Sequence, residues 1–111
     1  MKKIYLATPY SDPSSAIKFI RFNDVNMVAA KLMSQGYAVF SPISHNHPIA
    51  QSGNLPMGWE FWQEYDKIFL EWCDELWVLM LPGWKKSIGV QAEIKIANEM
   101  GKYIHYITRE I

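Results

Sequence analysis

The sequence predicts an α/β domain, with a mostly parallel sheet of about four strands and helices on both faces. Short apolar runs alternate with longer amphipathic segments along the chain, which is the pattern of strands followed by helices. A chain of 111 residues has room for only one hydrophobic core, so we expect a single domain over residues 1–111. Half of the residues are hydrophobic and 14% are aromatic, which is enough to form that core and excludes a disordered chain.

The first predicted strand and helix occupy residues 4 to 36. Ile4–Ala7 is a short apolar run of the kind found in buried strands. Asp12 and Pro13 favour the start of a helix, with Asp12 as the N-cap and Pro13 in the first helical position. This helix is expected to run to about Gln35, because Gly36 is a typical helix terminator.

The middle of the chain is predicted to hold two further strands, separated by a loop and a helix. Tyr37–Phe40 is the second strand. Residues 41–55 contain two prolines and a glycine and are predicted to form a loop. A helix is expected from about residue 56 to residue 73. Leu76–Leu81 is a continuous apolar run, which is typical of a strand covered on both faces.

The last helix is predicted over Ser87–Met100, with Gly101 as its stop, and the last strand over Tyr103–Ile107. Together these elements predict a flavodoxin-like or Rossmann-like sheet. Ligands of such sheets bind outside the carboxyl ends of the strands, where the strand order reverses. Those ends are expected at residues 8–11, 41–47 and 82–86.

Charge and composition exclude several kinds of partner. Eleven Lys and Arg residues balance eleven Asp and Glu residues, so we expect no nucleic-acid partner. No apolar run approaches the roughly 20 residues of a membrane span, and we expect no membrane contact. Met1–Lys3 leads into only about five apolar residues, too few for a secretory signal. Cys73 is the only cysteine and cannot form an internal disulfide, so a cytoplasmic location is expected.

Two carboxylates fall on apolar helix faces, where the pattern alone would place aliphatic residues. On a helical wheel Glu93 lies within the apolar arc of the last helix, next to Ala97. Asp66 lies within the apolar arc of the preceding helix, near Trp59 and Cys73. A buried carboxylate must be paired, protonated or exposed to a polar cavity, so each acid could hold a structural hydrogen bond or ion pair. Alternatively, both acids could point into one cleft.

The cleft interpretation predicts glycosyl transfer, because both helices flank the same predicted strand. Glycosyl transfer uses two carboxylates with differently tuned pKa values, one as nucleophile and one as general acid. Ser87 and Gly89 open the last helix, less than two turns before Glu93. Ser87 is either an ordinary N-cap or part of an anion or sugar site at the helix N-terminus.

His45 and His47 follow the second predicted strand at a position that faces ligands. The pair could bind a metal ion, but no third ligand has convincing spacing, and we expect neither a metal nor a cofactor. His45 is instead predicted to contact the substrate. The apolar residues of the helix over residues 56–73 cover more than half of its circumference, which predicts a subunit interface in a homodimer or larger assembly.

Three segments resemble the nucleoside 2-deoxyribosyltransferase superfamily. Ile4–Tyr10 is similar to the opening strand and first loop of that superfamily, and Ser87–Glu93 to the segment that carries its nucleophilic glutamate. Asp66 precedes Asp74 by eight residues, which matches the interval between the superfamily's second acid and the aspartate that opens the third strand. The resemblance covers nearly the whole chain.

The resemblance implies roles for individual residues. Glu93 would attack the anomeric carbon of a 2′-deoxynucleoside or its monophosphate, and Asp66 would protonate or orient the departing base. Tyr5 would orient Glu93, and Ser87 would contact a 5′-phosphate. The first loop carries three further expected substrate contacts: Thr8, Pro9 and Tyr10. Thr8 stands where the superfamily usually has glycine.

The predicted function is therefore that of an N-glycosidase or deoxyribosyltransferase in nucleotide metabolism, with a nucleoside or nucleotide as its small-molecule substrate. One alternative is a non-catalytic nucleotide-binding or sensing module on the same fold, since fold does not determine function. A third hypothesis is a structural oligomerisation protein. The pair of acids distinguishes the enzyme from the two other hypotheses, because a protein that only binds a nucleotide does not need two acids beside the sugar.

Overall fold

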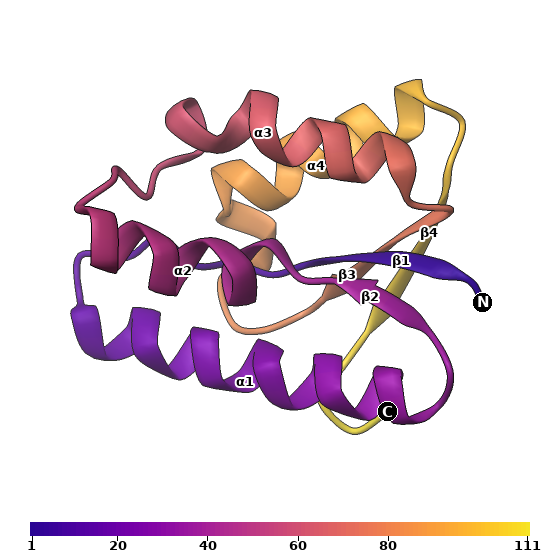
Figure 1. The fold of residues 1–111 in the computed structure, drawn as a ribbon, viewed down its shortest axis with the longest axis horizontal. Helices are drawn as coiled ribbons and strands as arrows, with labels where there is room; N and C mark the ends of the chain where they lie inside the picture. The colour runs from indigo at the N-terminus through magenta and orange to yellow at the C-terminus, as the bar shows by residue number, and fades with distance from the viewer.

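Four parallel strands form the central sheet of the computed structural model, which describes residues 1–111 (Figure 1). The strand order is β2-β1-β3-β4, so β1 and β3 lie at the centre. Tyr5 in β1 is paired with Phe40 of β2 on one side and Leu76 of β3 on the other. The strands are β1 (Lys3–Ala7), β2 (Ala38–Phe40), β3 (Glu75–Leu79) and β4 (Tyr103–Ile107).

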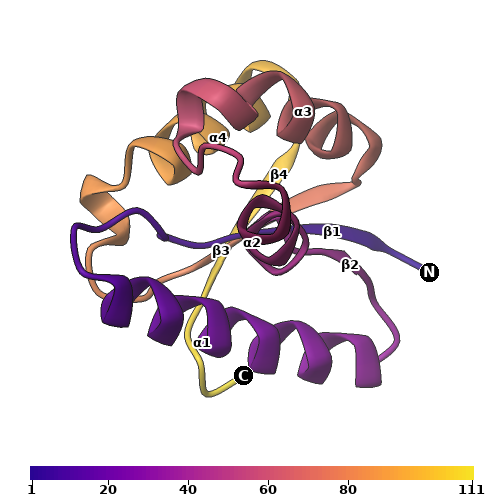
Figure 2. The ribbon, with the colours of Figure 1, turned by 60° about the vertical axis from the view of Figure 1, so that its left-hand side comes forward.

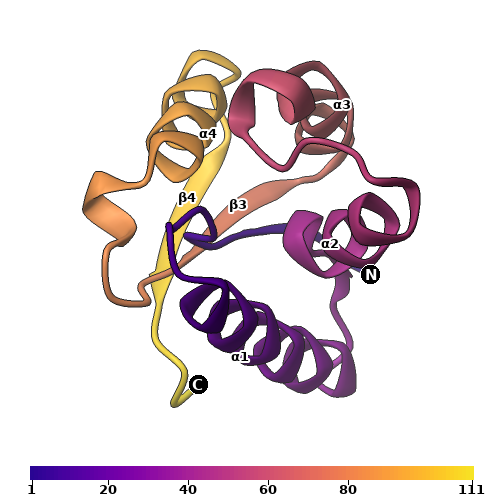
Figure 3. The same ribbon diagram turned by 90° about the vertical axis from the view of Figure 1, so that its left-hand side faces the viewer.

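Four α-helices surround the sheet and form three layers with it. Helix α1 covers one face, and α3 and α4 lie side by side over the other (Figure 3). Helix α2 lies between these two helical layers, against α1 and β1 (Figure 2). The helices are α1 (Ser15–Ser34), α2 (Pro42–Gly53), α3 (Trp59–Trp72) and α4 (Ile88–Glu99), with a short 3₁₀ turn, η1, at Trp84–Lys86.

Alternate residues of β1 supply the two halves of the core, as the two-residue period of a strand requires. Tyr5 and Ala7 pack with α3 and α4, together with Leu70 and Val90. Leu6 points to the opposite face and packs with α1 residues that include Val25, Val28 and Leu32. Burial on both faces explains why the central strands are continuous apolar runs. None of the helices combines the length and the apolar character that crossing a membrane requires.

The predicted fold class is confirmed, since the structure is an α/β fold with a four-stranded parallel sheet and helices on both faces. The predicted loop over residues 41–55 is wrong, because most of that segment forms α2. Pro42 occupies the first turn of this helix, where the missing N–H costs nothing. Pro48 lies inside the helix and removes one backbone hydrogen bond, but its neighbours Asn46 and His47 are buried in tertiary contacts that hold the helix in place.

The N-cap of the first helix also differs from the prediction. Ser14, not Asp12, caps α1, and its side chain accepts a hydrogen bond from the Ile17 backbone N–H at 3.3 Å. The Asp12 carboxylate accepts one from the Ser14 backbone N–H at 2.8 Å, so it orders the turn before the helix. The helix therefore starts at Ser15, two residues later than Pro13 suggests.

Candidate active site

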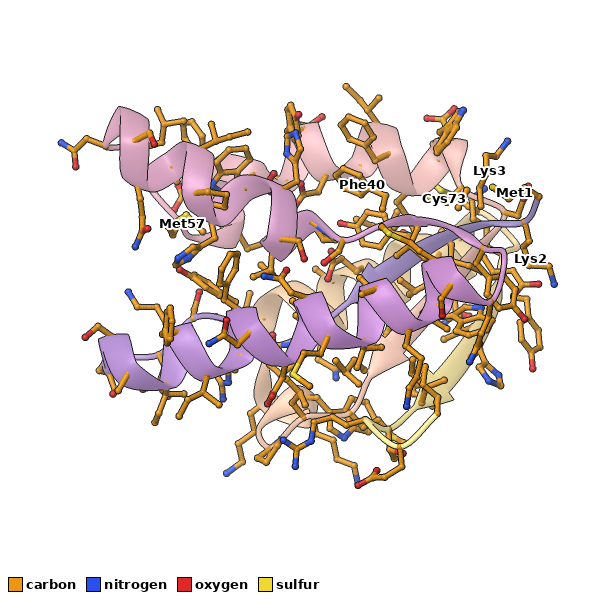
Figure 4. All side chains as sticks on the ribbon, turned by 60° about the horizontal axis from the view of Figure 1, so that its bottom comes forward. Met1, Lys2, Lys3, Phe40, Met57 and Cys73 are labelled. Carbon is orange, nitrogen blue, oxygen red and sulfur yellow. The ribbon has the colours of Figure 1, made fainter.

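A pocket of about 550 Å³ lies beyond the carboxyl ends of β1 and β3. The chain leaves β1 towards α1 on one face and leaves β3 towards α4 on the other, so the strand order reverses between them. The pocket walls come from the loop after β1 and from α2, α3 and α4. One lining residue, Met57, lies at the end of the molecule opposite Lys3 and Cys73 (Figure 4). The volume suits a small organic ligand.

Asp66 and Glu93 both line this pocket, although each is only 5% exposed. Asp66 comes from α3 and Glu93 from α4, two helices that pack against each other over the same face of the sheet. The two residues that the helical pattern singled out therefore share one site. Neither carboxylate forms an ion pair; the salt bridges of the molecule lie elsewhere, on its surface.

Tyr5 lies beneath the pocket and is the hydrogen-bond partner of the Glu93 carboxylate. Its hydroxyl, carried by the middle of β1, donates a hydrogen bond to Glu93 Oε2, and the tyrosine is fully buried. Burial raises the pKa of Glu93 to about 8, and the charge of Asp66 raises it as well, whereas the Tyr5 hydrogen bond lowers it. Burial and the nearby Glu93 charge raise the pKa of Tyr5 well above its ordinary value, so it remains a donor at neutral pH.

Asp66 has a different partner. The Asn46 side-chain amide on α2 donates a hydrogen bond to Asp66 Oδ1 at 2.9 Å. Burial raises the pKa of Asp66 to about 6, while the Asn46 hydrogen bond and the charge of His45 lower it. With pKa values of about 6 and about 8, the two acids together hold about one proton at neutral pH. Such a pair can supply a carboxylate and a proton donor at the same time.

The N-terminus of α4 forms one end of the pocket. Ser87 is the N-cap, and its hydroxyl accepts a hydrogen bond from the Val90 backbone N–H at 3.2 Å. Ser87 and Gly89 also line the pocket, together with Lys86. The ordinary capping role is thus present, and the N-terminus of the helix, with its unpaired N–H groups, borders the pocket.

The loop after β1 contributes three pocket residues, Thr8, Tyr10 and Ser11. Thr8 is 5% exposed, and its hydroxyl is buried without a hydrogen-bond partner. Tyr10 lines the pocket, and its hydroxyl shares a hydrogen bond with Nδ1 of His47, whose ring stacks on Phe22. Nearly all buried polar side chains have a partner, so the Thr8 hydroxyl is free to bond a water or a ligand group in the pocket.

Three predicted site residues do not line the pocket: Tyr5, Pro9 and His45. Tyr5 lies beneath the pocket and bonds to Glu93, and Pro9 is fully buried beside Thr8. His45 packs against Phe40 and other aromatic rings, and reaches the site only through a hydrogen bond between its Nδ1 and Asn46 Oδ1 at 2.9 Å.

The chain matches, over residues 2–108, the family model described as Domain of unknown function (DUF1937). The chain belongs to this family. The match includes every strand and helix and all residues of the pocket. No curated protein matches the sequence. The DUF1937 description names no activity, so the resemblance to the deoxyribosyltransferase superfamily stays a prediction.

The DUF1937 site includes one residue that the sequence did not single out, Asn46, which lines the pocket. Its neighbour His47, considered above only as a metal ligand, bonds to the pocket residue Tyr10. Both lie in the segment predicted to be a loop, so no helical period was applied to it. Both are buried, at 2% and 6% exposure. Their burial follows the helical spacing of α2, whose buried residues also include Pro42 and Ala50, and it is visible only once α2 is recognised. No group of three or more His, Cys, Asp or Glu side chains is arranged to hold a metal ion.

Arg21 ties together the two loops that flank the DUF1937 pocket. Its guanidinium donates hydrogen bonds to the backbone oxygens of Tyr10 at 3.3 Å and Ser11 at 3.1 Å, and to that of Pro82 at 3.0 Å. A Cβ atom on Gly83 would lie 2.8 Å from Arg21 Nη2, and Gly83 also has a φ of +93°. Glycine therefore satisfies both the turn and the close approach of the arginine.

We expect Arg21→Lys to destabilise the protein by about 1–3 kcal/mol, because one ammonium group cannot replace a planar fork that reaches three carbonyls in two loops. Thermal denaturation measures the effect. Arg109→Lys is the matched control, since Arg109 is the only other arginine and its bond to Asp24 lies on the surface. Equal melting temperatures for the two variants would show that Arg21 holds neither loop.

Proposed function

We propose that this protein cleaves the N-glycosidic bond of a nucleoside or nucleoside monophosphate, as an N-glycosidase or a deoxyribosyltransferase. One observation carries the proposal: two buried carboxyls, Asp66 and Glu93, line the same pocket from adjacent helices and have different hydrogen-bond partners. Different surroundings are what gives two carboxyls different roles in glycosyl transfer. The resemblance of the Ile4–Tyr10 and Ser87–Glu93 segments to the deoxyribosyltransferase superfamily supports the same reaction.

The proposed reaction is a double displacement that retains the configuration of the sugar. The Glu93 carboxylate attacks the anomeric carbon, the bond to the base nitrogen breaks, and its electron pair leaves with the base. Asp66 gives its proton to that base. In the second step water, or a second base, attacks the anomeric carbon and displaces Glu93, while Asp66 takes back the proton that the attacking group loses.

The proton balance of the site suits this scheme. The reactive form has Glu93 ionised and Asp66 protonated, and it contains one proton, as the pair does at neutral pH. The two carboxyls share that proton, so the singly protonated pair includes the reactive arrangement. Positive charge that develops on the sugar favours ionised Glu93, and the electron pair that leaves with the base draws the proton of Asp66 towards the base.

The remaining pocket surface fits a nucleoside. Apolar side chains from α2 and from the start of α3, among them Ile43, Trp59 and Trp62, offer a wall for a planar base. The unpartnered Thr8 hydroxyl and the N-terminus of α4 offer hydrogen bonds to sugar hydroxyls or to a 5′-phosphate.

The test is incubation with nucleosides and their 5′-monophosphates, in both ribose and 2′-deoxyribose forms, followed by chromatography for free base. Addition of a second base separates the two activities, because a transferase then makes a new nucleoside whereas a hydrolase releases sugar. Release of free base supports the proposal. Saturable binding of a nucleotide with no base release would contradict it and support the non-catalytic binding module.

We also propose that the protein is a homodimer formed through an apolar stripe on α3. Four exposed residues with spacings of four, three and four positions lie on one side of this helix: Phe61, Tyr65, Ile68 and Trp72. The buried residues Trp62, Asp66 and Leu70 occupy the other side. A two-fold axis would pack this stripe against its own copy and cover it.

We expect sedimentation at micromolar concentration to give a dimer for the native protein and a monomer for Ile68→Lys. Ile68 is 65% exposed in the single chain, so the lysine leaves the fold intact but places a charge in the contact. Met27→Lys on α1 is the control, because Met27 is at least as exposed as Ile68 but lies outside the stripe. A native protein that sediments as a monomer would refute the dimer.

A further inference from the structure

Asn46 is a buried amide whose two ends are both occupied. Its Nδ2 donates a hydrogen bond to Asp66 Oδ1 at 2.9 Å, and its Oδ1 is 2.9 Å from Nδ1 of His45. Asn46 is 2% exposed and lines the pocket beside Asp66. An unbroken chain of hydrogen bonds thus runs from His45 through Asn46 to Asp66.

The chemistry of these groups determines the direction of each bond. The amide oxygen of Asn46 only accepts, so His45 must carry a hydrogen on Nδ1 and donate it. This holds the amide with its NH₂ group towards Asp66. Since an NH₂ group only donates, Asp66 Oδ1 is the accepting oxygen. The proton of a neutral Asp66 is then carried by Oδ2, the oxygen that Asn46 does not engage.

His45 is itself held in place by its surroundings. Its ring packs against Phe40, Tyr65 and Phe69, with centroid distances of 5.7, 5.9 and 6.4 Å. Its backbone N–H donates to the Ser41 carbonyl in the first turn of α2. His45 and Asn46 are neighbours in a helix and point in different directions, so one ring can pack among aromatic residues while the next side chain faces the pocket.

We propose that His45 and Asn46 are positioning residues that determine which oxygen of Asp66 carries the proton given to the leaving base. The proposal rests on the proposed function, in which Asp66 is the proton donor. His45 orients the Asn46 amide, and the amide holds Asp66 Oδ1. The acidic proton is thereby confined to Oδ2, and the side chain is kept from rotating when the base approaches.

The groups that face Asp66 show what the loss of Asn46 would change. His45 and Asn46 approach from α2, Glu93 from α4 and Tyr5 from β1. The Asn46 bond and the His45 charge favour the ionised form of Asp66, whereas its burial and a charged Glu93 oppose that form. Removal of the amide donor therefore makes Asp66 a weaker acid.

The experiment is a carboxyl carbon NMR titration of Asp66 in the ligand-free protein. We expect Asn46→Leu to raise the proton affinity of Asp66 about tenfold, because a hydrogen bond to the carboxylate is lost. His45→Phe keeps the aromatic packing but frees the amide, and it should act in the same direction. Asn26→Leu is the control, because Asn26 is half-buried and bonds to Ser44, away from Asp66.

Base release provides the second measurement. With a substrate from the panel, the acid limb of the pH–rate profile should move to higher pH in both variants, because the first deprotonation of the pair falls mainly on Asp66. The kcat should fall with little change in KM, because the proton donor is less well oriented. If Asn46→Leu fails to fold, His45→Phe decides the matter alone. An unchanged Asp66 titration in a folded variant would overturn the positioning role of His45 and Asn46 and leave the proposed function standing. A shifted titration, with no base released by the native protein from any substrate, would instead support the hydrogen-bond chain from His45 to Asp66 and refute the proposed function.

Discussion

Glu93→Gln is expected to abolish base release, by on the order of 10³-fold or more, while the fold stays intact. Gln retains the volume of Glu and an oxygen that accepts the Tyr5 hydrogen bond, but it cannot act as a carboxylate nucleophile. The loss should fall on every substrate that the native protein accepts. The measurement is chromatography of free base, with Glu99→Gln, an exposed glutamate of the same helix, as the control.

The melting temperature of the same variant tests whether Glu93 is instead a structural acid. The pKa of Glu93 is raised from 4.5 to about 8 in the folded protein, so this carboxyl binds more protons when folded than when unfolded between those pH values. Stability conferred by its protonated form is complete below about pH 4.5 and is lost as the pH rises towards 8. Glutamine removes that loss, so the variant should melt at the same temperature as the native protein near pH 5 and at a higher one near pH 8.

A structural acid would give the opposite result. If Glu93 held a buried cation, removal of its charge would strand that cation and cost several kcal/mol. The only hydrogen-bond partner of Glu93 is the neutral Tyr5 hydroxyl, so no cation is stranded. A large fall in melting temperature together with residual base release would refute the nucleophile.

Glu93 and Asp66 could be found from the sequence because a helical period makes a misplaced polar residue visible. Each is a carboxylate within an apolar arc, and the structure brings both into one pocket. Ser87 was found from a different local signal, its position as N-cap of the predicted helix, and it does cap α4. In each case a local pattern was sufficient.

Asn46 and Arg21 could not be found, for two different physical reasons. Pro42 and Pro48 are residues typical of loops, so the segment does not suggest a helix. Without a helical period, the burial of Asn46 leaves no visible pattern in the sequence. Arg21 could not be found because its three partners are backbone carbonyls, which have no sequence signature, and one of them, that of Pro82, is 61 residues away in the chain. Tertiary contacts stabilise α2 against its proline, and only the folded chain reveals them.

The rate of base release is expected to follow a bell-shaped pH profile with limbs near 6 and 8. Below pH 6 both acids are protonated and no carboxylate remains to attack the sugar. Above pH 8 both are ionised and the leaving base receives no proton. These limbs belong to the pair, because two interacting acids lose their protons in two shared steps.

Asp66→Asn should remove the alkaline limb and leave one limb on the acid side. The remaining limb reports Glu93 alone, and it should lie below pH 8, because the charge of Asp66, which raises the pKa of Glu93, is gone. Glu64→Gln, at an exposed position of the same helix, is the control and should keep both limbs. The profile is measured as kcat/KM against pH with one substrate. If the alkaline limb survives in Asp66→Asn, another group protonates the base, and Asp66 is left with the orientation of the base as its role.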